Sequence, residues 1–147
     1  MALTLSTGCV KKTLDTSPLR TLLNLCKINI YSGTKPTSPD DVPNGTLLVT
    51  ISNAGTATGL TWDTTAPGGV LPKAPAETWS GTIAATGTAG WFRIWESGDT
   101  PSNASTTAVR IDGTISSTGA DLNLTNLSLV SGAPFIMNTA TITLPKS

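Results

Sequence analysis

The sequence predicts an all-β protein: a β-sandwich, jelly-roll or immunoglobulin-like, of about eight strands with a short helical N-terminal arm. Three observations favour this fold class. Beyond residue 24, apolar and polar residues alternate with the period of two that half-buried strands require. Clusters of Gly, Pro, Asn and Asp separate the alternating runs at spacings of roughly 8 to 15 residues. Threonine, which suits a pleated and half-exposed surface, occupies many of the polar positions.

The chain divides into two parts. Its 147 residues, 38% of them hydrophobic, suit one hydrophobic core. We predict residues 1–24 as an N-terminal arm with short helices and residues 25–147 as the β-sandwich domain. The boundary lies where the helical spacing of leucines gives way to the alternation of strands.

Two short helices are expected in the arm. Ser6 or Thr7 can cap the first, which places Val10 and Leu14 on one face. The second begins at residues 17–18, where a serine N-cap precedes a proline at the first helical position. Its apolar face consists of Leu19, Leu22 and Leu23. This apolar surface must be covered, either by the chain's own sheet or by a neighbouring subunit.

Four runs in the first half of the domain predict strands. Cys26, Ile28 and Ile30 alternate with polar residues and end at a Ser-Gly turn. A proline-rich loop over residues 35–45 precedes the next strand. Residues 70–75 contain two prolines and are expected to form a loop or an edge segment. The four predicted strands cover residues 26–31, 47–52, 60–64 and 78–83.

The most aromatic run, residues 91–96, is expected to be a central strand because both of its faces carry large side chains. Trp91, Arg93 and Trp95 share one face, so the Arg93 guanidinium can stack on an indole or extend along the sheet. A polar loop follows over residues 97–107. The remaining predicted strands, the second of them in short pieces, cover residues 109–115, 122–129 and 136–144.

The charged residues are few and balanced. Nine acidic and nine basic residues give a net charge of zero, and the chain contains no histidine. Because histidine is the commonest general base and metal ligand near neutral pH, this composition predicts that the protein is not an enzyme and uses no cofactor or metal. The sequence lacks the basic stripe typical of nucleic-acid binding and any apolar run of about 20 residues. We therefore expect neither nucleic acid nor a membrane as a partner.

The cysteines and the N-terminus bear on the cellular compartment. Cys9 and Cys26 are expected as reduced, partly buried thiols, because one possible bridge does not make a disulfide framework. Lys11 and Lys12 follow the apolar N-terminal residues instead of preceding them, which is the wrong order for a signal peptide. We therefore expect synthesis in a cytoplasm without export by that route.

Three other kinds of chemistry are open at this point. Tryptophans, above all Trp79 in the run Trp-Ser-Gly-Thr, can stack on sugar rings or serve as core and interface anchors. Glu77 and Glu96, the two glutamates, are the pair available for a glycosidase, which needs two carboxylates flanking a cleft. Asp40 and Asp41 can ligate calcium with Asn44, although the surrounding prolines disrupt an EF-hand pattern.

Six phrases of the sequence together carry a resemblance to a known family: LSTG, KINIYSGTKP, GTLLVTI, ETWSG, AGWFR and GADLNL. They begin at Leu5, Lys27, Gly45, Glu77, Ala89 and Gly119. With this set of phrases, most of the chain resembles a family of small proteins encoded among the virion genes of tailed bacteriophages. The resemblance implies a virion structural component and no catalytic residues.

Resemblance and composition together favour a virion structural protein of a tailed bacteriophage, made in the host bacterial cytoplasm and located in the virion. We expect a capsid decoration (cement) protein that binds the head surface, partnered by the major capsid protein or other virion subunits and by copies of itself in a homo-oligomer. The alternatives are a head–tail connector, collar or tail-associated protein, and a carbohydrate-binding module. The predicted interface residues are Leu3, Leu5, Val10, Leu14, Leu19, Leu22, Leu23, Trp62 and Trp79.

Overall fold

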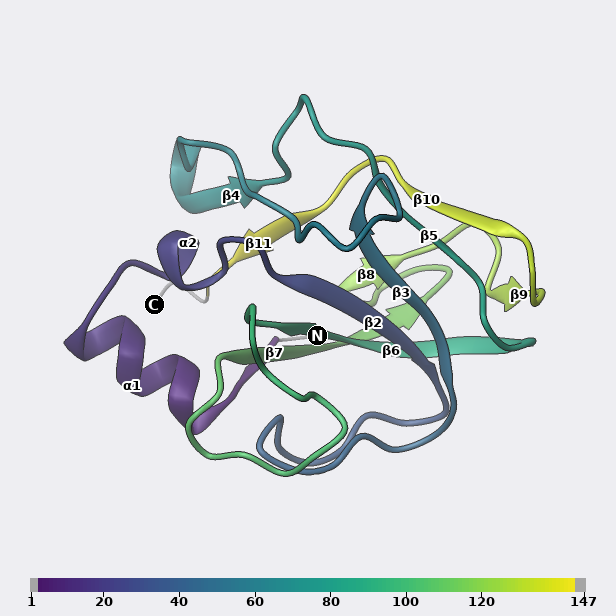
Figure 1. The fold of residues 1–147 in the computed structure, drawn as a ribbon, viewed down its shortest axis with the longest axis horizontal. Helices are drawn as coiled ribbons and strands as arrows, with labels where there is room; N and C mark the ends of the chain where they lie inside the picture. The colour runs from purple at the N-terminus through teal and green to yellow at the C-terminus, as the bar shows by residue number, and fades with distance from the viewer. Residues whose placement is uncertain (1–2, 145–147) are drawn as a thin grey trace.

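The computed structural model describes residues 3–144, so residues 1–2 of the predicted arm and 145–147 of the predicted β-domain lie outside the described residues. Two helices, α1 (Thr7–Asp15) and α2 (Leu19–Leu22), lie at one side of the described part of the molecule (Figure 1). The remaining elements are β1 (Thr4–Leu5), β2 (Lys27–Ser32), β3 (Leu47–Asn53), the 3-10 turn η1 (Pro67–Gly69), β4 (Val70–Pro72), β5 (Trp79–Thr82), β6 (Gly87–Trp95), β7 (Arg110–Ser116), β8 (Leu122–Asn123), β9 (Ser128–Leu129), β10 (Pro134–Met137) and β11 (Thr141–Thr143).

Within residues 3–144, nine strands form one open sheet in the order β1-β7-β6-β2-β3-β5-β10, with β8 paired to β7 and β9 paired to β6. Strands β4 and β11 form a separate two-stranded sheet. All ladders are antiparallel except that of β7 and β8. The prediction of a mostly β protein with short N-terminal helices is confirmed.

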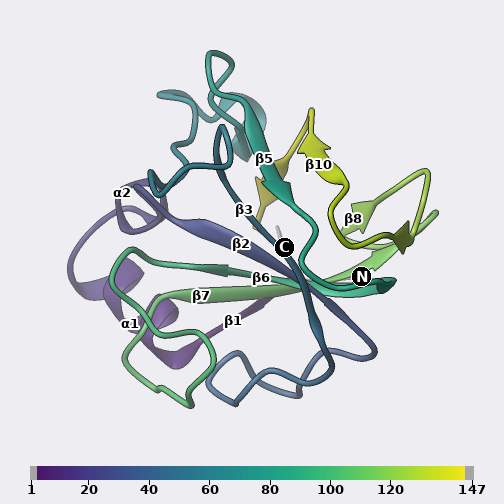
Figure 2. The ribbon, with the colours of Figure 1, turned by 45° about the vertical axis from the view of Figure 1, so that its right-hand side comes forward.

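The two stacked sheets of the predicted sandwich are not seen among the described strands. In a sandwich, β5 and β10 would belong to a second sheet. Here β5 pairs with β3 and β10 pairs with β5, so both strands continue the first sheet. Figures 1 and 2 show the result, a strongly twisted sheet in which β3 crosses from the level of β6 and β7 to that of β5 and β10.

One face of the sheet is apolar. Across five neighbouring strands the register aligns Ile51, Ile28, Ile94, Ile111 and Leu5. Because directly opposed residues point to the same face of a sheet, these side chains form one row. The four isoleucines are at most 3% exposed, and the row lies in the hydrophobic core.

The adjacent row of residues, on the opposite face, is polar. It consists of Thr50, Asn29, Arg93, Asp112 and Thr4 on the same five strands. Thr50 Oγ1 donates to Asn29 Oδ1 at 2.9 Å, and the middle three side chains are at most 3% exposed. Buried polar groups are tolerated only when they are hydrogen-bonded. This row therefore limits which segments of the chain can cover the face.

Most predicted strands are present, and the differences have local causes. The run at 60–64 forms only isolated bridges, at Leu60 and Trp62, because the Pro-Gly-Gly turn of η1 follows it closely. The run at 136–144 is divided between β10 and β11. Strand β6 begins at Gly87, earlier than predicted. The sequence did not indicate this start, because the first residues of the strand are small and show no alternation of apolar and polar residues.

Candidate interaction surfaces

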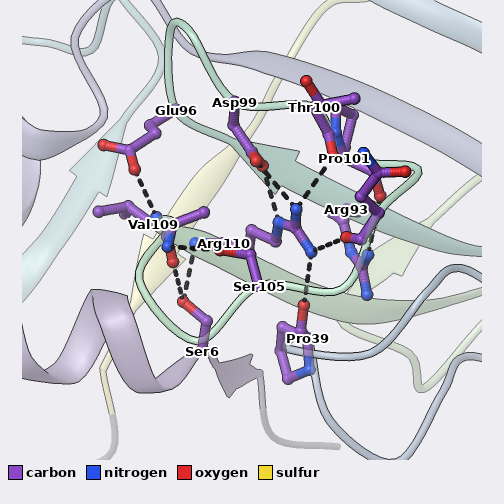
Figure 3. Close-up of polar contacts among 12 residues, drawn as sticks. Ser6, Pro39, Arg93, Glu96, Asp99, Thr100, Pro101, Ser105, Val109 and Arg110 are labelled. Carbon is purple, nitrogen blue, oxygen red and sulfur yellow. Dashed lines mark hydrogen bonds and ion pairs between the residues drawn. The ribbon is translucent and has the colours of Figure 1, made fainter.

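Buried contacts attach the N-terminal arm to the end of the sheet. Strand β1 pairs with β7, and the fully buried Ser6 caps α1, its Oγ accepting a hydrogen bond from the Cys9 N–H at 3.0 Å. The same Oγ accepts from the Arg110 N–H at 3.0 Å (Figure 3) and donates to the Ala108 carbonyl at 2.7 Å. Of the two caps predicted for this helix, Ser6 and Thr7, the structure shows Ser6, whose hydroxyl also joins the helix to the sheet. The predicted serine cap of the second helix is wrong, because Pro18 is the N-cap of α2 and no side chain caps that helix.

Helix α1 presents an apolar pair outward. Val10 is 45% exposed and Leu14 is 80% exposed, and their spacing of four residues places them side by side on the helix surface. At the helix N-terminus, the Asp40 carboxylate accepts hydrogen bonds from the Thr7 N–H at 3.0 Å and from its hydroxyl at 2.6 Å. A negative charge at this end stabilises a helix. The apolar pair therefore lies on a helix that is fixed at its first turn.

The other predicted interface residues contribute to the chain's own core. Leu23, Trp62 and Trp79 are at most 6% exposed. The leucines that are partly buried against the same core are Leu3, Leu5, Leu19 and Leu22. An additional role of these seven side chains in a contact between subunits stays a prediction, whereas the two α1 residues are accessible to a partner.

Two long loops, residues 33–46 and 97–109, cover the polar face of the sheet, and we call them the clamped loops. Arg93 of β6 donates from Nη1 to the carbonyl of Asp41 at 3.0 Å in the first loop. The same nitrogen donates to the carbonyl of Pro101 at 3.2 Å in the second loop. The Arg93 side chain is 0% exposed. One buried guanidinium thus holds both loops against β6.

Arg110 of β7 makes a second junction of the same kind (Figure 3). Its Nε and Nη2 donate to the two oxygens of Asp99 at 2.7 and 2.9 Å. Its Nη1 donates to the carbonyls of Pro39 at 3.2 Å and Asn103 at 2.9 Å. The Arg110 side chain is 0% exposed and that of Asp99 6%. Because the guanidinium fork is planar and rigid, these bonds fix the position of both clamped loops.

Asp112 and the aromatic rings complete the polar face. Arg93 donates from Nε and Nη2 to the two Asp112 oxygens, each at 2.8 Å. Burial raises the pKa of Asp112 above its ordinary value, and the hydrogen bonds from Arg93 act in the opposite direction. The Arg93 guanidinium also lies 5.5 Å from the centre of the Trp91 ring, which confirms the stacked alternative of the prediction. Tyr31 stacks on Trp91 with ring centres 4.4 Å apart.

The four tryptophans differ in exposure. Trp62 and Trp79 pack edge to face at 4.9 Å, and the Trp79 Nε1 donates to the Glu77 carboxylate at 2.9 Å. Trp95 is partly exposed and lines a hollow of about 310 Å³ with Lys27, whose Nζ lies 5.8 Å from the ring centre. Trp95 is therefore the indole that is available to a ligand.

The two glutamates lie in separate hydrogen-bond networks. Glu77 accepts bonds from the Thr61 N–H at 2.9 Å and from its hydroxyl at 2.8 Å. Glu96 accepts from Lys12 Nζ at 2.9 Å and from the Val109 N–H at 2.8 Å. Within the described residues, no hydrogen bond or shared partner joins the two carboxylates. Each of them holds a nearby loop segment in place.

The two cysteines are buried, and Asp41 of the predicted calcium site is already hydrogen-bonded. Cys9 and Cys26 are free, as predicted, and both are fully buried instead of partly buried. Burial raises the pKa of Cys9 to about 11 and that of Cys26 to about 12, so neither is a thiolate near neutral pH. Asp41 accepts a hydrogen bond from the Ser38 N–H at 3.3 Å. Within residues 3–144, no group of three or more His, Cys, Asp or Glu side chains is placed to hold a metal ion.

Part of the network that positions the clamped loops was not predicted. Arg93 was expected only to stack on an indole or extend along the sheet, and no role was predicted for Arg110, Asp99 or Asp112. The available signal is that Arg110 and Asp112 lie inside the alternation of residues 109–115, where a charge on a covered face needs a partner.

Comparisons of the chain with protein-family models, with curated proteins and with solved structures found no match. Over residues 3–144, no helix is long and apolar enough to cross a membrane. A functional proposal therefore depends on the surfaces described above and on the sequence resemblance.

Proposed function

We propose that this protein is a structural subunit of a tailed-bacteriophage virion that decorates the head by binding the major capsid protein. The observation that carries the proposal is the exposed apolar pair Val10 and Leu14 on a helix that buried contacts hold against the sheet. Apolar groups on an ordered element lose their contact with water on binding without the entropy cost of ordering a free arm. The resemblance to small virion proteins supports the same function.

The proposed mechanism is burial of apolar surface, without chemistry. Each copy can bind weakly, because many copies on one shell act together and raise the effective affinity. A net charge of zero keeps the repulsion between neighbouring copies small, which suits self-association on the shell. The clamped loops add a surface that needs no reordering on binding, since Arg93 and Arg110 already fix them.

The first test is the copy number in purified virions, measured by quantitative mass spectrometry against the major capsid protein. A head decorator is expected in hundreds of copies, whereas a connector or collar subunit of a symmetric ring is expected in about a dozen. The lower number would move the protein to the neck or tail, and absence from particles would reject the virion proposal.

A pair of substitutions tests the binding surface. Leu14→Glu places a charge on the exposed apolar pair and is expected to weaken binding to undecorated heads about tenfold or more. The control is Val130→Glu, because Val130 is 57% exposed and follows β9, on the other side of the molecule from α1 (Figure 1). Equal binding by the two variants would show that α1 is not the docking helix.

A carbohydrate-binding module is the second candidate, favoured by the partial exposure of Trp95 beside its hollow. Indoles that bind sugars stack on the apolar face of the sugar ring. The test is a titration of tryptophan fluorescence with host polysaccharides, comparing the parent with Trp95→Phe. Quenching that Trp95→Phe abolishes would support this function, and an unchanged signal across the panel would reject it.

A further inference from the structure

A groove of about 890 Å³ opens on the apolar face of the sheet, opposite the clamped loops. This volume lies in the range of roughly 300–1,000 Å³ that binding pockets occupy. Its floor includes Ile28, Phe92 and Ile94, which belong to the core and are at most 6% exposed, and its more accessible apolar lining comes from Leu3, Leu122 and Leu144. Residues of β8 line it as well, and so do residues of β11. The groove thus combines an apolar floor with backbone from two short strands.

Both of these strands have an open edge. Among the described residues, β8 pairs with β7 and with no other strand, and β11 pairs with β4 and with no other strand. The backbone N–H and C=O groups on their remaining edges are therefore not used by a neighbouring strand. Such edges are templates for the addition of a further strand.

The lining of the groove has one charged side chain. It is Asp121, and the lining contains no lysine or arginine among the described residues. Asp121 binds Thr114 through one oxygen, Oδ2, which accepts from the N–H at 2.9 Å and from the hydroxyl at 3.0 Å. The second oxygen makes no hydrogen bond within residues 3–144. An occupant with a positive charge beside its apolar side chains is therefore complementary to the groove.

We propose that the groove binds an extended segment of a partner polypeptide as an added β-strand. Its backbone pairs with the open edges of β8 and β11, its alternate apolar side chains contact Leu3, Leu122 and Leu144, and a lysine or arginine lies next to Asp121. The identification of the partner as another virion subunit rests on the proposed function. The addition of a strand does not rest on it.

The experiment uses the full chain and the synthetic peptide acetyl-Thr-Val-Thr-Val-Lys-Val-Thr-Val-Thr-amide. The control peptide has proline at the third and seventh positions, which keeps the valines and the charge but removes two ladder donors. Affinities are measured by calorimetry, and hydrogen exchange is followed at Leu122–Asn123 and Thr141–Thr143. With the first peptide at about ten times its Kd, exchange at both strands is expected to slow about tenfold. The proline peptide is expected to protect neither strand.

The charge is tested on both partners. Asp121→Asn keeps an acceptor for Thr114 and is expected to weaken peptide binding about threefold to fivefold. Asp15→Asn is the control, because that carboxylate is 55% exposed on α1 and outside the groove lining. A peptide with glutamate in place of lysine tests the same contact without changing the protein. Its affinity for the parent protein is expected to be no higher than the affinity of the lysine peptide for Asp121→Asn.

Three results would overturn the proposal. Equal binding of the proline peptide would assign the groove to apolar ligands in general. Binding without protection of β8 and β11 would place the peptide elsewhere. Protection that appears without peptide as the protein concentration rises would assign the groove to a second copy of this chain. None of these results changes the copy number in virions or the effect of Leu14→Glu, so the two proposals fail separately.

Discussion

Replacing Arg110 with methionine should strongly destabilise the fold, because the side chain of Arg110 is fully buried and all of its hydrogen-bond partners depend on it. Methionine keeps an apolar stem of similar length but removes all donors. The carboxylate of Asp99, 6% exposed, then loses both of its charge-assisted bonds. The carbonyls of Pro39 and Asn103 lose the donor Nη1, and that of Thr100 loses a bond from Nη2 of 3.2 Å.

The magnitude follows from the burial of the pair. Removing one partner of a buried ion pair costs about 3–5 kcal/mol, since the remaining charge is left uncompensated. Out of a typical stability of roughly 5–15 kcal/mol, this is a large fraction. For a domain of this size each kcal/mol lowers the melting temperature by roughly 2–4 °C, so a fall of about 6–20 °C is expected.

Urea denaturation followed by tryptophan fluorescence measures the loss, and hydrogen exchange in the clamped loops shows whether they detach first. The matched control is Lys11→Met, which breaks an ion pair whose side chains are 73% and 55% exposed and which should leave the midpoint unchanged within error. Adding Asp99→Asn to Arg110→Met should restore part of the stability by removing the orphaned charge. If Arg110→Met behaves like Lys11→Met, the buried pair does not hold the loops.

Three further predictions concern stability. Gly8→Ala should lower the melting temperature in a thermal scan, because the added Cβ would lie 2.4 Å from the backbone of Thr107; helix propensity alone predicts a gain of about 1 kcal/mol, and such a gain would refute the contact. Burial raises the pKa of Cys26 from 9.0 to about 12. Above pH 9 the thiol therefore loses its proton in the unfolded chain first, and the free energy of unfolding falls by at most about 1.4 kcal/mol per pH unit. Urea titrations in that pH range should show a shallower decline for Cys26→Ala. Tyr31→Phe removes the hydroxyl that accepts from Asn29 Nδ2 at 3.0 Å and should cost about 1–3 kcal/mol in urea denaturation, because the buried amide loses its partner.

The strands could be predicted from the sequence because alternation reports burial residue by residue. Strands β2, β3, β5 and β7 therefore lie within a residue of the runs that predicted them. Alternation does not report which strands pair. Strand β10 pairs with the edge of β5 instead of joining a second sheet. This pairing depends on contacts between segments that are distant in the sequence. The open sheet was for this reason not predictable from local pattern.

The candidate surface was predictable in part. The cap at Ser6 and the spacing of Val10 and Leu14 indicated a helix with an apolar pair. The same reasoning grouped Leu23 with Leu14, yet one is 0% and the other 80% exposed. Both are leucines at helical spacing, and only the packing of the arm against the sheet separates them. The role of Arg110 escaped prediction for a related reason, since its partners come from loops that have no periodic pattern.

The arm is not a detachable tether, and this changes how its function can be studied. Ser6 binds the Arg110 backbone, and β1 is part of the main sheet. Gly8 lies so close to residues 107–108 that no side chain fits. Deleting residues 1–16 would remove a strand, a buried hydroxyl and the core residue Cys9 together, so loss of binding would not separate docking from folding. Because Leu14 is 80% exposed, its substitution changes the surface and leaves those contacts in place. A point change at Leu14 therefore tests the docking helix where a truncation cannot.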